Sequence, residues 1–416
     1  MFNLAILKVT SFCNLDCTYC YMFNQMDKTF EKVINNMPLD TALASLDRIE
    51  RHCQEHEKKV FHITLHGGEP SLWPYENFVG FFKEVDRIRS KGYKISVSMQ
   101  TNGLKISPEL LRLLSASRTT LGVSLDGPQS LNDAARTTKN GRGSYERVMR
   151  TVESILDSEH AHLLHGFLSV AQPQLPPIEY FEWANSLPLR RLDVLWPLEF
   201  NYGNYPWKME GLTAYSERPR YGAWFSELFD LWWNYDDPDL HIRYFYECLY
   251  SLMGSGRHIE SIVNDRIPIV VVNTDGGIEY HDYLRSYSDG GTRTNFNVHR
   301  NDLTDLANDP GFDFLLNLHK HMPKECKGCA HESLCGGGLL AGRADRGDSI
   351  PRKKSVLCLD EYLFFSHLKE RLSEVLQGVG APLEMVRHGL TDGEINKTGF
   401  SPRLYFAELA SGQASD

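Results

Sequence analysis

Short apolar runs alternate with helical patterns over residues 4–200, and this alternation limits the fold more than any other feature of the sequence. The runs have the length of buried strands, and the segments between them carry apolar residues with helical periodicity. A chain that repeats strand and helix in this way builds a parallel sheet flanked by helices, and such a sheet binds ligands at the carboxyl ends of its strands. The expected strands are residues 4–9, 62–65, 95–99, 121–125, 164–170 and 193–196, and the expected helices begin at 39, 75, 108, 144 and 177.

The loop after the first expected strand holds three cysteines, Cys13, Cys17 and Cys20, with an aromatic residue directly before the last. Three thiolates this close together can bind three corners of a cubane 4Fe–4S cluster, which leaves one iron with an open position. A partial zinc site is the alternative, but it would normally require a fourth cysteine or histidine nearby, and the loop contains neither. The loop therefore predicts an iron–sulfur cluster that takes part in chemistry.

Polar motifs also follow the second, third and fourth expected strands. The glycines of the first motif allow its backbone to approach a ligand closely, and its carbonyls, together with its glutamate, can accept hydrogen bonds from an ammonium group. Because the motifs begin where parallel strands stop, we expect them to meet at one edge of the sheet. They are Gly67-Gly68-Glu69-Pro70, Gln100-Thr101-Asn102-Gly103 and Ser124-Leu125-Asp126-Gly127-Pro128, the last followed by Asn132 and Arg136.

In the cysteine loop and in all three motifs, residues 4–200 resemble the radical S-adenosylmethionine (SAM) enzymes. The resemblance implies an α/β fold, a partial (β/α)6 barrel of the TIM type. It also implies that the open iron chelates the amino and carboxylate groups of SAM, and that an electron from the cluster cleaves SAM to a 5′-deoxyadenosyl radical. By the same resemblance the cofactor-binding residues are Gly67, Gly68, Glu69, Pro70, Thr101, Asn102, Ser124, Asp126 and Arg136.

Within this set the resemblance assigns different roles. Ser124 is expected to contact the ribose or the carboxylate of SAM. Arg136 is a candidate for the SAM carboxylate, although an arginine in a loop is often a structural salt-bridge residue. Asp126 is expected to brace its loop rather than to touch substrate, and Asn132 stands where the family usually has a histidine.

The second half of the chain contains four further clustered cysteines, which form a closed ligand set. A four-cysteine zinc ribbon is an alternative, because zinc sites also use Cys-x2-Cys pairs. The pattern resembles the SPASM extension of radical SAM enzymes, a twitch-like auxiliary domain that usually holds two clusters on seven cysteines. Leu339 and His281 stand at two of the usual cysteine positions, so the resemblance implies a single auxiliary 4Fe–4S cluster. Its ligands are Cys326, Cys329, Cys335 and Cys358.

The residue after His281 is Asp282, and in sulfatase-maturating members of the SPASM group an aspartate at this place takes a proton from the substrate. A carboxylate beside a substrate radical can act as a general base. His281 and Asp282 are therefore the expected catalytic residues for proton removal. The alternative is that both are polar hairpin residues in solvent.

Composition excludes several other classes of function. The chain has 416 residues and a net charge of −10, which argues against general nucleic-acid binding. No apolar run has the length of a membrane span, and the first residues do not resemble a signal peptide, so we expect a cytoplasmic protein with no membrane partner. Nine cysteines in such a chain indicate metal binding or catalysis rather than disulfides, and Cys53 and Cys248 are expected in the core.

The sequence divides into four expected segments: the radical SAM barrel over residues 1–200, an aromatic-rich helical bridge over 201–260, the SPASM-like domain over 261–378, and a partly disordered extension over 379–416. The bridge is expected to form two helices broken at 237–238, and its aromatic residues either pack a core or line a cleft for a peptide. The SPASM-like domain is expected to begin with a hairpin over 267–272 and 278–284 and to end with a helix over 360–377.

The opening residues 8–24 look like those of maturases of ribosomally made peptides, in the branch that includes the cyclophane-forming and FxsB-like enzymes. The implied reaction abstracts a side-chain hydrogen from a precursor peptide, at Cβ, and forms a cross-link such as a cyclophane. Oxidation of Ser or Cys to formylglycine, peptide epimerisation and a zinc-stabilised binding module without catalysis are the alternatives. The implied partners are the precursor peptide and an electron donor of the flavodoxin or ferredoxin type. Because the chain starts at its first strand, we expect the precursor to dock on the barrel, on the bridge or on a separate leader-binding protein.

Overall fold

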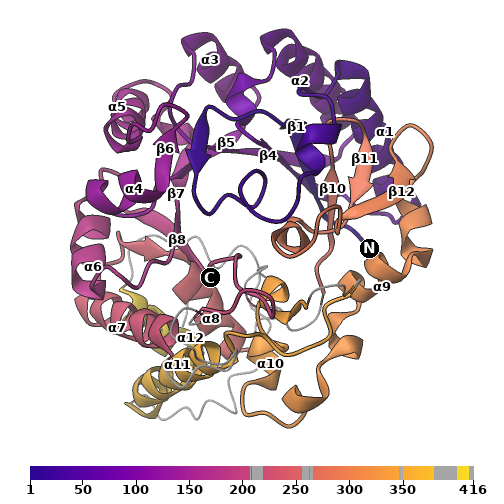
Figure 1. The fold of residues 1–416 in the computed structure, drawn as a ribbon. Helices are drawn as coiled ribbons and strands as arrows, with labels where there is room; N and C mark the ends of the chain where they lie inside the picture. Colours follow the sequence, from indigo (N-terminus) through magenta and orange to yellow (C-terminus); the bar gives the residue numbers. More distant parts are fainter. Residues whose placement is uncertain are drawn as a thin grey trace. The chain divides into compact units, whose positions relative to one another are not determined.

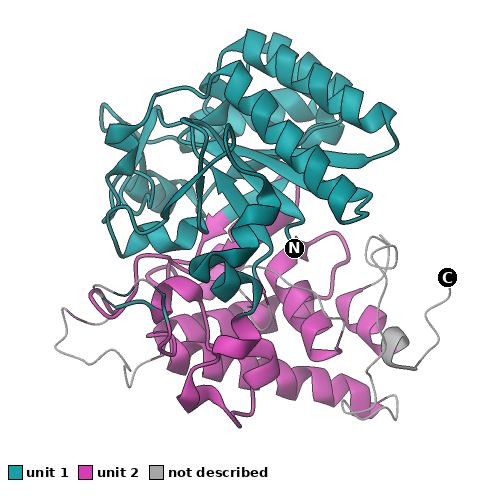
Figure 2. Ribbon diagram, turned by 90° about the vertical axis from the view of Figure 1, so that its right-hand side faces the viewer, with its two compact units in different colours: residues 1–168, 267–317, 344–351 teal, residues 169–266, 318–343, 352–416 magenta. Residues whose placement is uncertain are grey.

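The computed structural model describes residues 1–206, 208, 219–254, 262, 266–345, 348, 350–378 and 401–411. The chain forms two compact units, shown in different colours in Figure 2. Unit 1 contains residues 1–168, 267–317 and 344–351, and unit 2 contains residues 169–266, 318–343 and 352–416. The units are defined by which residues lie close together in space. Their boundaries differ from those of the four segments expected from the sequence, and that division into four segments stays a prediction.

Unit 1 is built on a mostly parallel sheet, drawn in Figure 1. Strands β1, β3, β4, β5 and β7 run parallel, and β10 joins β1 in parallel on the other side. The predicted α/β fold with a parallel sheet is confirmed. In spatial order the strands are β12 (Arg293–Asn297), β11 (Gly277–Glu279), β10 (Ile269–Val272), β1 (Leu4–Thr10), β3 (Val60–Gly67), β4 (Lys94–Thr101), β5 (Thr120–Ser124) and β7 (Leu164–Val170).

The helices that follow these strands begin where the sequence predicts. In α1, the apolar face that includes Leu46 and Ile49 is buried, and in α3 the side chain of Ser107 caps the first turn by accepting a hydrogen bond from Leu110 N–H at 3.1 Å. The helices of unit 1 are α1 (Leu39–Glu55), α2 (Tyr75–Ser90), α3 (Pro108–Ala116), α4 (Gln129–Ala135), α5 (Tyr145–Leu156) and α9 (Pro310–Leu316).

The expected hairpin exists, but its second strand is shorter than predicted. Strand β11 ends at Glu279, and a 3-10 helix, η5 (Asp282–Ser286), replaces the rest of the expected strand. The first turn of η5 buries an ion pair between Asp282 and Arg285 three residues apart, and this local contact requires a helical backbone. Because β10 pairs with β1, the hairpin is part of the parallel sheet, and η5 follows directly after it.

Unit 2 is mainly helical. Its elements are α6 (Pro177–Ser186), β8 (Arg191–Leu195), α7 (Arg220–Tyr235), β9 (His241–Ile242), α8 (Arg243–Leu252), α10 (Glu332–Cys335), α11 (Cys358–Gly378) and α12 (Pro402–Ser411). Strand β8, the sixth predicted strand, pairs in parallel with β9. Helix α12 is a correction, because loops were expected beyond residue 378, and the expected disordered tip lies outside the described residues.

The aromatic residues of the bridge form the core of unit 2. Trp232 and Trp233 on α7 are each 1% exposed, and Phe245 on α8 and Phe364 on α11 are fully buried. The core interpretation is therefore confirmed for these residues, whereas Tyr235 is 47% exposed, and Trp207 and Tyr215 lie outside the described residues. Cys248 is buried in the same region, and Cys53 is buried in unit 1, as predicted.

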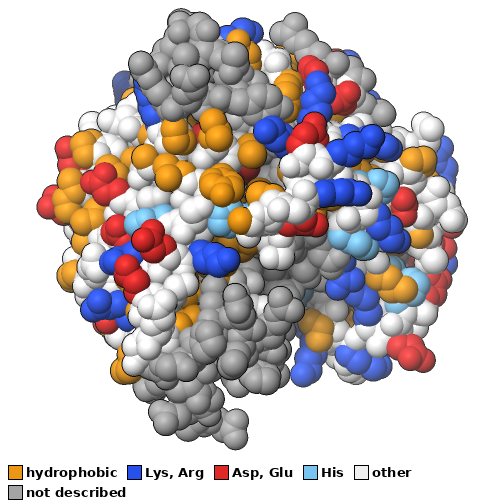
Figure 3. Space-filling view, turned by 90° about the horizontal axis from the view of Figure 1, so that it is seen from below, with side chains coloured by type: hydrophobic (Ala, Val, Ile, Leu, Met, Phe, Trp, Pro, Cys, Tyr) orange, Lys and Arg blue, Asp and Glu red, His pale blue; other side chains and the backbone are white. Residues whose placement is uncertain are grey.

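The distribution of charge and the character of the helices bear on which partners the protein could bind. Acidic and basic side chains lie interspersed on the face drawn in Figure 3. Among the described residues, no helix combines the length and the apolar character that a membrane crossing requires.

Candidate active site

Part of the cysteine loop is held by backbone pairing in a separate two-stranded sheet. Its short strand β2 (Leu15–Cys17) pairs antiparallel with β6 (Arg136–Thr138), so that Cys17 lies opposite Arg136. Thr18 N–H donates to the carbonyl of Ala135 at 3.0 Å, directly after this pairing. The loop is therefore positioned by the segment that follows the fourth barrel strand.

The three thiols of the loop lie near one another in a poorly solvated place. Burial raises the pKa of Cys13 and of Cys17 to about 11, and neighbouring thiols add to both shifts. Burial also raises the pKa of Cys20. Thiols of raised pKa are protonated at neutral pH, so a metal that binds them would have to displace their protons.

The chemistry of the donor set, three thiols in one short loop, suits an iron–sulfur cluster. Within the described part of the chain, no three His, Cys, Asp or Glu side chains are arranged to hold one metal ion. A cubane distributes its thiolates over separate irons, so its ligands need not converge on one point. The loop fits a cluster that is held by Cys13, Cys17 and Cys20.

The two glycines of the first motif are required by the close approach of the backbone of the cysteine loop. A Cβ at Gly67 would lie 2.1 Å from the carbonyl oxygen of Thr10, and one at Gly68 would lie 2.2 Å from that of Phe12. Gly68 N–H donates to Thr10 at 2.7 Å, and Glu69 N–H donates to Phe12 at 2.9 Å. The glycines thus hold the motif against the loop.

Glu69 joins the first motif to the second. Its buried carboxylate accepts hydrogen bonds from Ser71 N–H at 3.0 Å, Thr101 Oγ1 at 2.7 Å and Asn102 N–H at 2.7 Å. Burial raises the pKa of Glu69, and these donors oppose the shift. Glu69 therefore holds the first motif and the second together, and Pro70 begins the turn that follows.

The side chain of Asn102 connects the second motif to the cysteine loop. Its amide nitrogen lies 3.7 Å from Cys13 Sγ and donates to Asn14 Oδ1 at 2.7 Å. Its amide oxygen accepts from Leu104 N–H at 3.0 Å. Asn102 is thus in contact with a thiol of the cysteine loop.

A buried polar chain connects the third motif to the cysteine loop. The Tyr19 hydroxyl donates to the carboxylate of Asp126 and accepts from Arg136 Nη1 at 2.8 Å. Asp126 and Arg136 are 1% and 6% exposed. Nε of Arg136 is buried and has no hydrogen-bond partner among the described residues, so this guanidinium can still receive a carboxylate such as that of SAM.

The other two polar residues near this motif have protein partners. Ser124 Oγ accepts a hydrogen bond from the Gln100 amide at 3.0 Å. The fully buried Asn132 accepts from Asp126 N–H at 3.3 Å and donates to Ser144 Oγ at 3.1 Å. Asn132 therefore supports the loop that presents Asp126.

A charged cluster lies at the carboxyl end of β1, in the same unit. Lys8 is fully buried and forms an ion pair with Asp282, and its Nζ lies 3.3 Å from Nδ1 of His66, its register partner on β3. Tyr21, directly after Cys20, donates to Asp282 Oδ2 at 3.4 Å. Burial acts to raise the pKa of Asp282, but Lys8, Arg285 and His66 outweigh it and hold that pKa well below its usual range.

Arg285 extends this cluster. It is fully buried, pairs with Asp27 and Glu279, and lies 3.2 Å from Asp282. The sequence left open the alternative that Asp282 is a polar hairpin residue in solvent. This alternative is wrong, because Asp282 is 3% exposed. His281 is 1% exposed and its Nδ1 accepts from Tyr283 N–H at 3.2 Å, so it caps η5.

The second cysteine group lies within unit 2. Cys335 ends α10, Cys358 begins α11, and Cys329 N–H donates to the carbonyl of Cys326 at 3.2 Å. Burial raises the pKa of Cys335 well above its ordinary value, and the neighbouring Cys358 and Cys326 contribute. The thiols of Cys326, Cys335 and Cys358 therefore influence one another, and Cys329 is connected to Cys326 through the backbone.

A buried arginine places a positive charge beside the thiols of the second cysteine group. Arg343 is fully buried, and the thiols of Cys326 and Cys335 partly offset the lowering of its pKa by burial, which leaves it at about 10. Leu339 is 2% exposed and its backbone N–H donates to Glu361 at 2.8 Å, so the position that lacks a cysteine is part of the core. The donor set of four thiols and one cation fits a fully ligated cluster.

Sequence reasoning missed Lys8, Tyr19, Tyr21 and Arg285. Lys8 gave a detectable signal, since a lysine inside an otherwise apolar parallel strand must be buried and paired. Tyr19 and Tyr21 flank Cys20, but nothing in their spacing indicates which carboxylates they reach. Arg285 could not be found, because its partners lie far away in the sequence.

A scan against protein families matches residues 7–167 to the Radical SAM superfamily. Among curated proteins, a cysteine-type anaerobic sulfatase-maturating enzyme of Clostridium perfringens (strain ATCC 13124) is 26% identical over 387 residues, which cover 91% of this chain and 99% of the relative. One of Clostridium novyi is 22% identical over 389 residues, with 90% and 96% covered. An uncharacterized protein of Synechocystis is 27% identical over 282 residues, 66% of each chain.

Two solved structures share the fold. Native anSMEcpe with bound AdoMet and the Cp18Cys peptide has a TM-score of 0.75 at 22% identity, and the match covers 90% of this chain and 99% of that one. Streptococcus suis SuiB bound to the precursor peptide SuiA has a TM-score of 0.56 at 15% identity, with 86% and 75% covered.

Proposed function

Because residues 7–167 form a radical SAM domain, we propose that this enzyme modifies a ribosomally made peptide by abstracting a hydrogen from an unactivated side-chain carbon. One observation supports the proposal best. The three thiols of the cysteine loop and the three polar motifs, which we call the SAM cradle, lie together at the carboxyl ends of the parallel strands and are connected by hydrogen bonds. When bound, the cluster and SAM supply an electron and a 5′-deoxyadenosyl radical; the protein supplies position and exclusion of water.

The residues of the cradle have separate tasks in this proposal. Arg136 receives the SAM carboxylate through its buried Nε, and the carbonyls of Gly67 and Gly68 receive the ammonium. Glu69 and Asp126 do not contact SAM in this proposal but fix the loops that do. The glycines and these two carboxylates therefore contribute preorganisation.

Proton removal falls to Asp282 rather than to His281. Lys8 and Arg285 keep Asp282 ionised, so the carboxylate is ready to accept a proton at any physiological pH. A carboxylate of lowered pKa is a weak base, but a substrate that has also lost an electron is a strong acid and needs no stronger base. His281 has its Nδ1 engaged in capping η5.

The bond formed is a cross-link within the peptide, such as a cyclophane, in our proposal. A carbon radical at Cβ attacks an acceptor in the same peptide, and one proton and one electron then leave. The thiols of Cys326, Cys329, Cys335 and Cys358 would hold an auxiliary cluster, which would supply a one-electron acceptor. A second candidate is oxidation of Ser or Cys to formylglycine, because sulfatase-maturating enzymes match 90% or more of this chain.

The test takes as candidate substrates the short peptides encoded by any small reading frames next to the gene of this protein. Each peptide and the enzyme are produced together, and the product is examined by mass spectrometry and fragmentation. Loss of two hydrogens, with fragmentation suppressed between two residues, supports a cross-link. A product that reacts with a hydrazide carries an aldehyde and supports formylglycine instead. No change in mass under conditions that yield 5′-deoxyadenosine contradicts both.

A further inference from the structure

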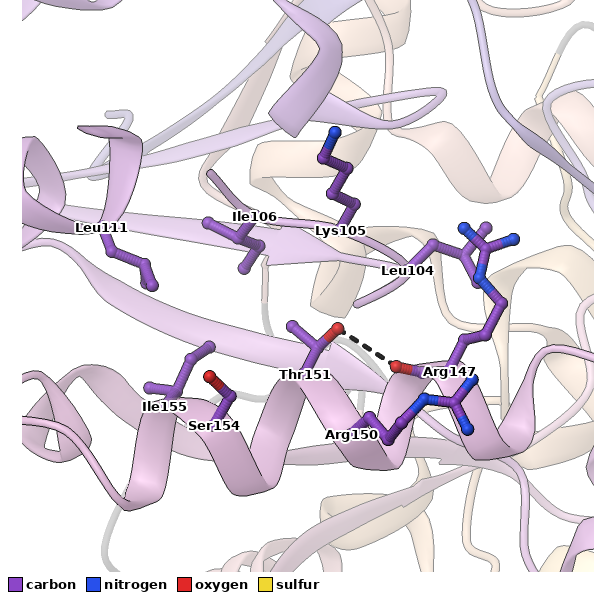
Figure 4. A pocket seen from close by; sticks show the side chains of 9 residues that line it. All are labelled: Leu104, Lys105, Ile106, Leu111, Arg147, Arg150, Thr151, Ser154 and Ile155. Carbon is purple, nitrogen blue, oxygen red and sulfur yellow. Dashed lines mark hydrogen bonds between the residues drawn. The ribbon is translucent and has the colours of Figure 1, made fainter. Parts of the chain in front are cut away.

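Unit 1 carries a surface pocket lined by basic side chains. Its volume is about 280 Å³, and it is formed by the segment after β4 and by α5. Lys105, Arg147 and Arg150 supply its charges and all three are exposed. Figure 4 shows both guanidinium groups at the Leu104 end of the pocket.

The pocket attracts anions although the chain as a whole is acidic. Three cations line it and no acidic side chain does. Arg150 lies 3.7 Å from Glu146, but both side chains are about two-thirds exposed, at 65% and 67%, so this pair neutralises little of the field. In a chain with a net charge of −10, a basic pocket is a distinct local feature.

One lining residue of the pocket, Leu104, is connected to the cysteine loop through the side chain of Asn102. Leu104 lines the pocket, and its N–H donates to the amide oxygen of Asn102 at 3.0 Å. The amide nitrogen of the same Asn102 lies 3.7 Å from Cys13 Sγ. Two contacts of one amide thus separate the pocket from a cluster ligand.

The basic region continues toward the loop. Lys139 and Arg142 are exposed on the turn between β6 and α5, and Lys139 Nζ lies 4.2 Å from the centre of the Phe12 ring. Phe12 is 44% exposed and directly precedes Cys13. Positive charge therefore also lies against an exposed aromatic ring of the cysteine loop itself.

We propose that this basic pocket is the docking surface of an acidic one-electron carrier protein of the flavodoxin type, which places its acidic side chains against Lys105, Arg147 and Arg150. The proposal rests on the proposed function, because that function requires one electron per cleavage of SAM. The carrier loses one electron, the C5′–S bond of SAM breaks, and methionine and the adenosyl radical form. Asn102 and Cys13 provide the short route from the surface.

The test is a triple charge reversal, Lys105→Glu, Arg147→Glu and Arg150→Glu. The matched control is Lys59→Glu, Lys83→Glu and Lys94→Glu, which changes the net charge equally; Lys59 and Lys94 stand at the opposite ends of the strands. All six side chains are exposed, so both variants are expected to fold. Binding of an oxidised bacterial flavodoxin to the anaerobically reconstituted chain is measured by calorimetry at two ionic strengths.

We expect the pocket variant to bind flavodoxin about tenfold more weakly and to lose the salt dependence of binding, while the control changes the affinity about twofold or less. Stopped-flow reduction of the cluster by flavodoxin hydroquinone should slow by a similar factor, with reduction by dithionite unchanged. Equal binding by wild type and pocket variant, or equal weakening in the control, overturns the proposal. Failure of the proposed function can be told apart from failure of the docking proposal. In the first case wild type releases no 5′-deoxyadenosine with dithionite, but its binding of flavodoxin can still be measured.

Discussion

Lys8 and Asp282 form an ion pair in which the side chains are 0% and 5% exposed. Lys8 lies on β1, five residues before the first cysteine of the loop, and Asp282 begins η5 after the hairpin. The pair thus connects segments that are far apart in sequence at the edge of the sheet where SAM is expected to bind. The hairpin is held there by the parallel pairing of β10 with β1.

Replacement of Lys8 by methionine should destabilise the fold strongly. The variant Lys8→Met leaves the Asp282 carboxylate buried without its nearest cation, and loss of one partner of a buried pair costs about 3–5 kcal/mol. Urea unfolding of wild type and variant measures the difference. The control Lys32→Met breaks the exposed pair with Asp289 and should leave the unfolding curve unchanged. Equal stability of Lys8→Met and wild type would contradict the account of this pair.

Stability should fall at acidic pH in a way that depends on Asp282. Lys8 and Arg285 hold the folded pKa of Asp282 below the unfolded value of about 3.9, so its contribution is complete above that value and is lost as the pH falls through the folded pKa. The unfolding free energy of wild type should therefore decrease between about pH 5 and pH 2 more than that of Asp282→Asn. Parallel profiles of the two proteins would show that Asp282 is not held ionised.

Glu69→Gln should weaken SAM binding without removing the cluster. The carboxylate serves three donors, and the glutamine would turn an N–H group toward at least one of them. An unsatisfied buried group costs about 1–3 kcal/mol, so we expect the Kd for SAM to rise about tenfold or more. Calorimetry measures the affinity, and iron content tests the cluster. The exposed Glu76→Gln on α2 serves as control, and an unchanged Kd in Glu69→Gln would contradict the bracing role.

Gly68→Ala should prevent assembly of the cluster in the loop. The new Cβ would lie 2.2 Å from the carbonyl oxygen of Phe12, which is backbone and cannot rotate away. We expect the iron content to fall from about eight to about four per chain. Gly378→Ala adds a Cβ with nothing within 4 Å and is the matched control. Full iron content in Gly68→Ala would show that the close approach is not required.

The strands and the cysteine loop could be predicted because their signals are local. Apolar runs mark β1, β3, β4, β5 and β7, and each motif begins near the end of a strand. The roles of glycines could be predicted only in part. The sequence indicated close approach to a ligand, and Gly67 and Gly68 in fact approach the backbone at Thr10 and Phe12.

The charged cluster could not be predicted because it depends on which distant segments meet. Nothing in the sequence around Arg285 indicates that Asp27 and Glu279 surround it. The predicted length of β11 was wrong for a related reason. The ion pairs that Asp282 forms with Lys8 and Arg285 favour the 3-10 helix η5 over an extended strand. Tertiary contacts here override the local pattern.

The most direct test of the central claim is SAM cleavage by the anaerobically reconstituted chain. With SAM and dithionite, wild type should release 5′-deoxyadenosine, and Cys248→Ala, which changes a buried core thiol, should do the same. A variant with Cys13, Cys17 and Cys20 all replaced by alanine should release none and should keep about four irons per chain at the second cysteine group. Release of 5′-deoxyadenosine by that variant at the wild-type rate would contradict the account.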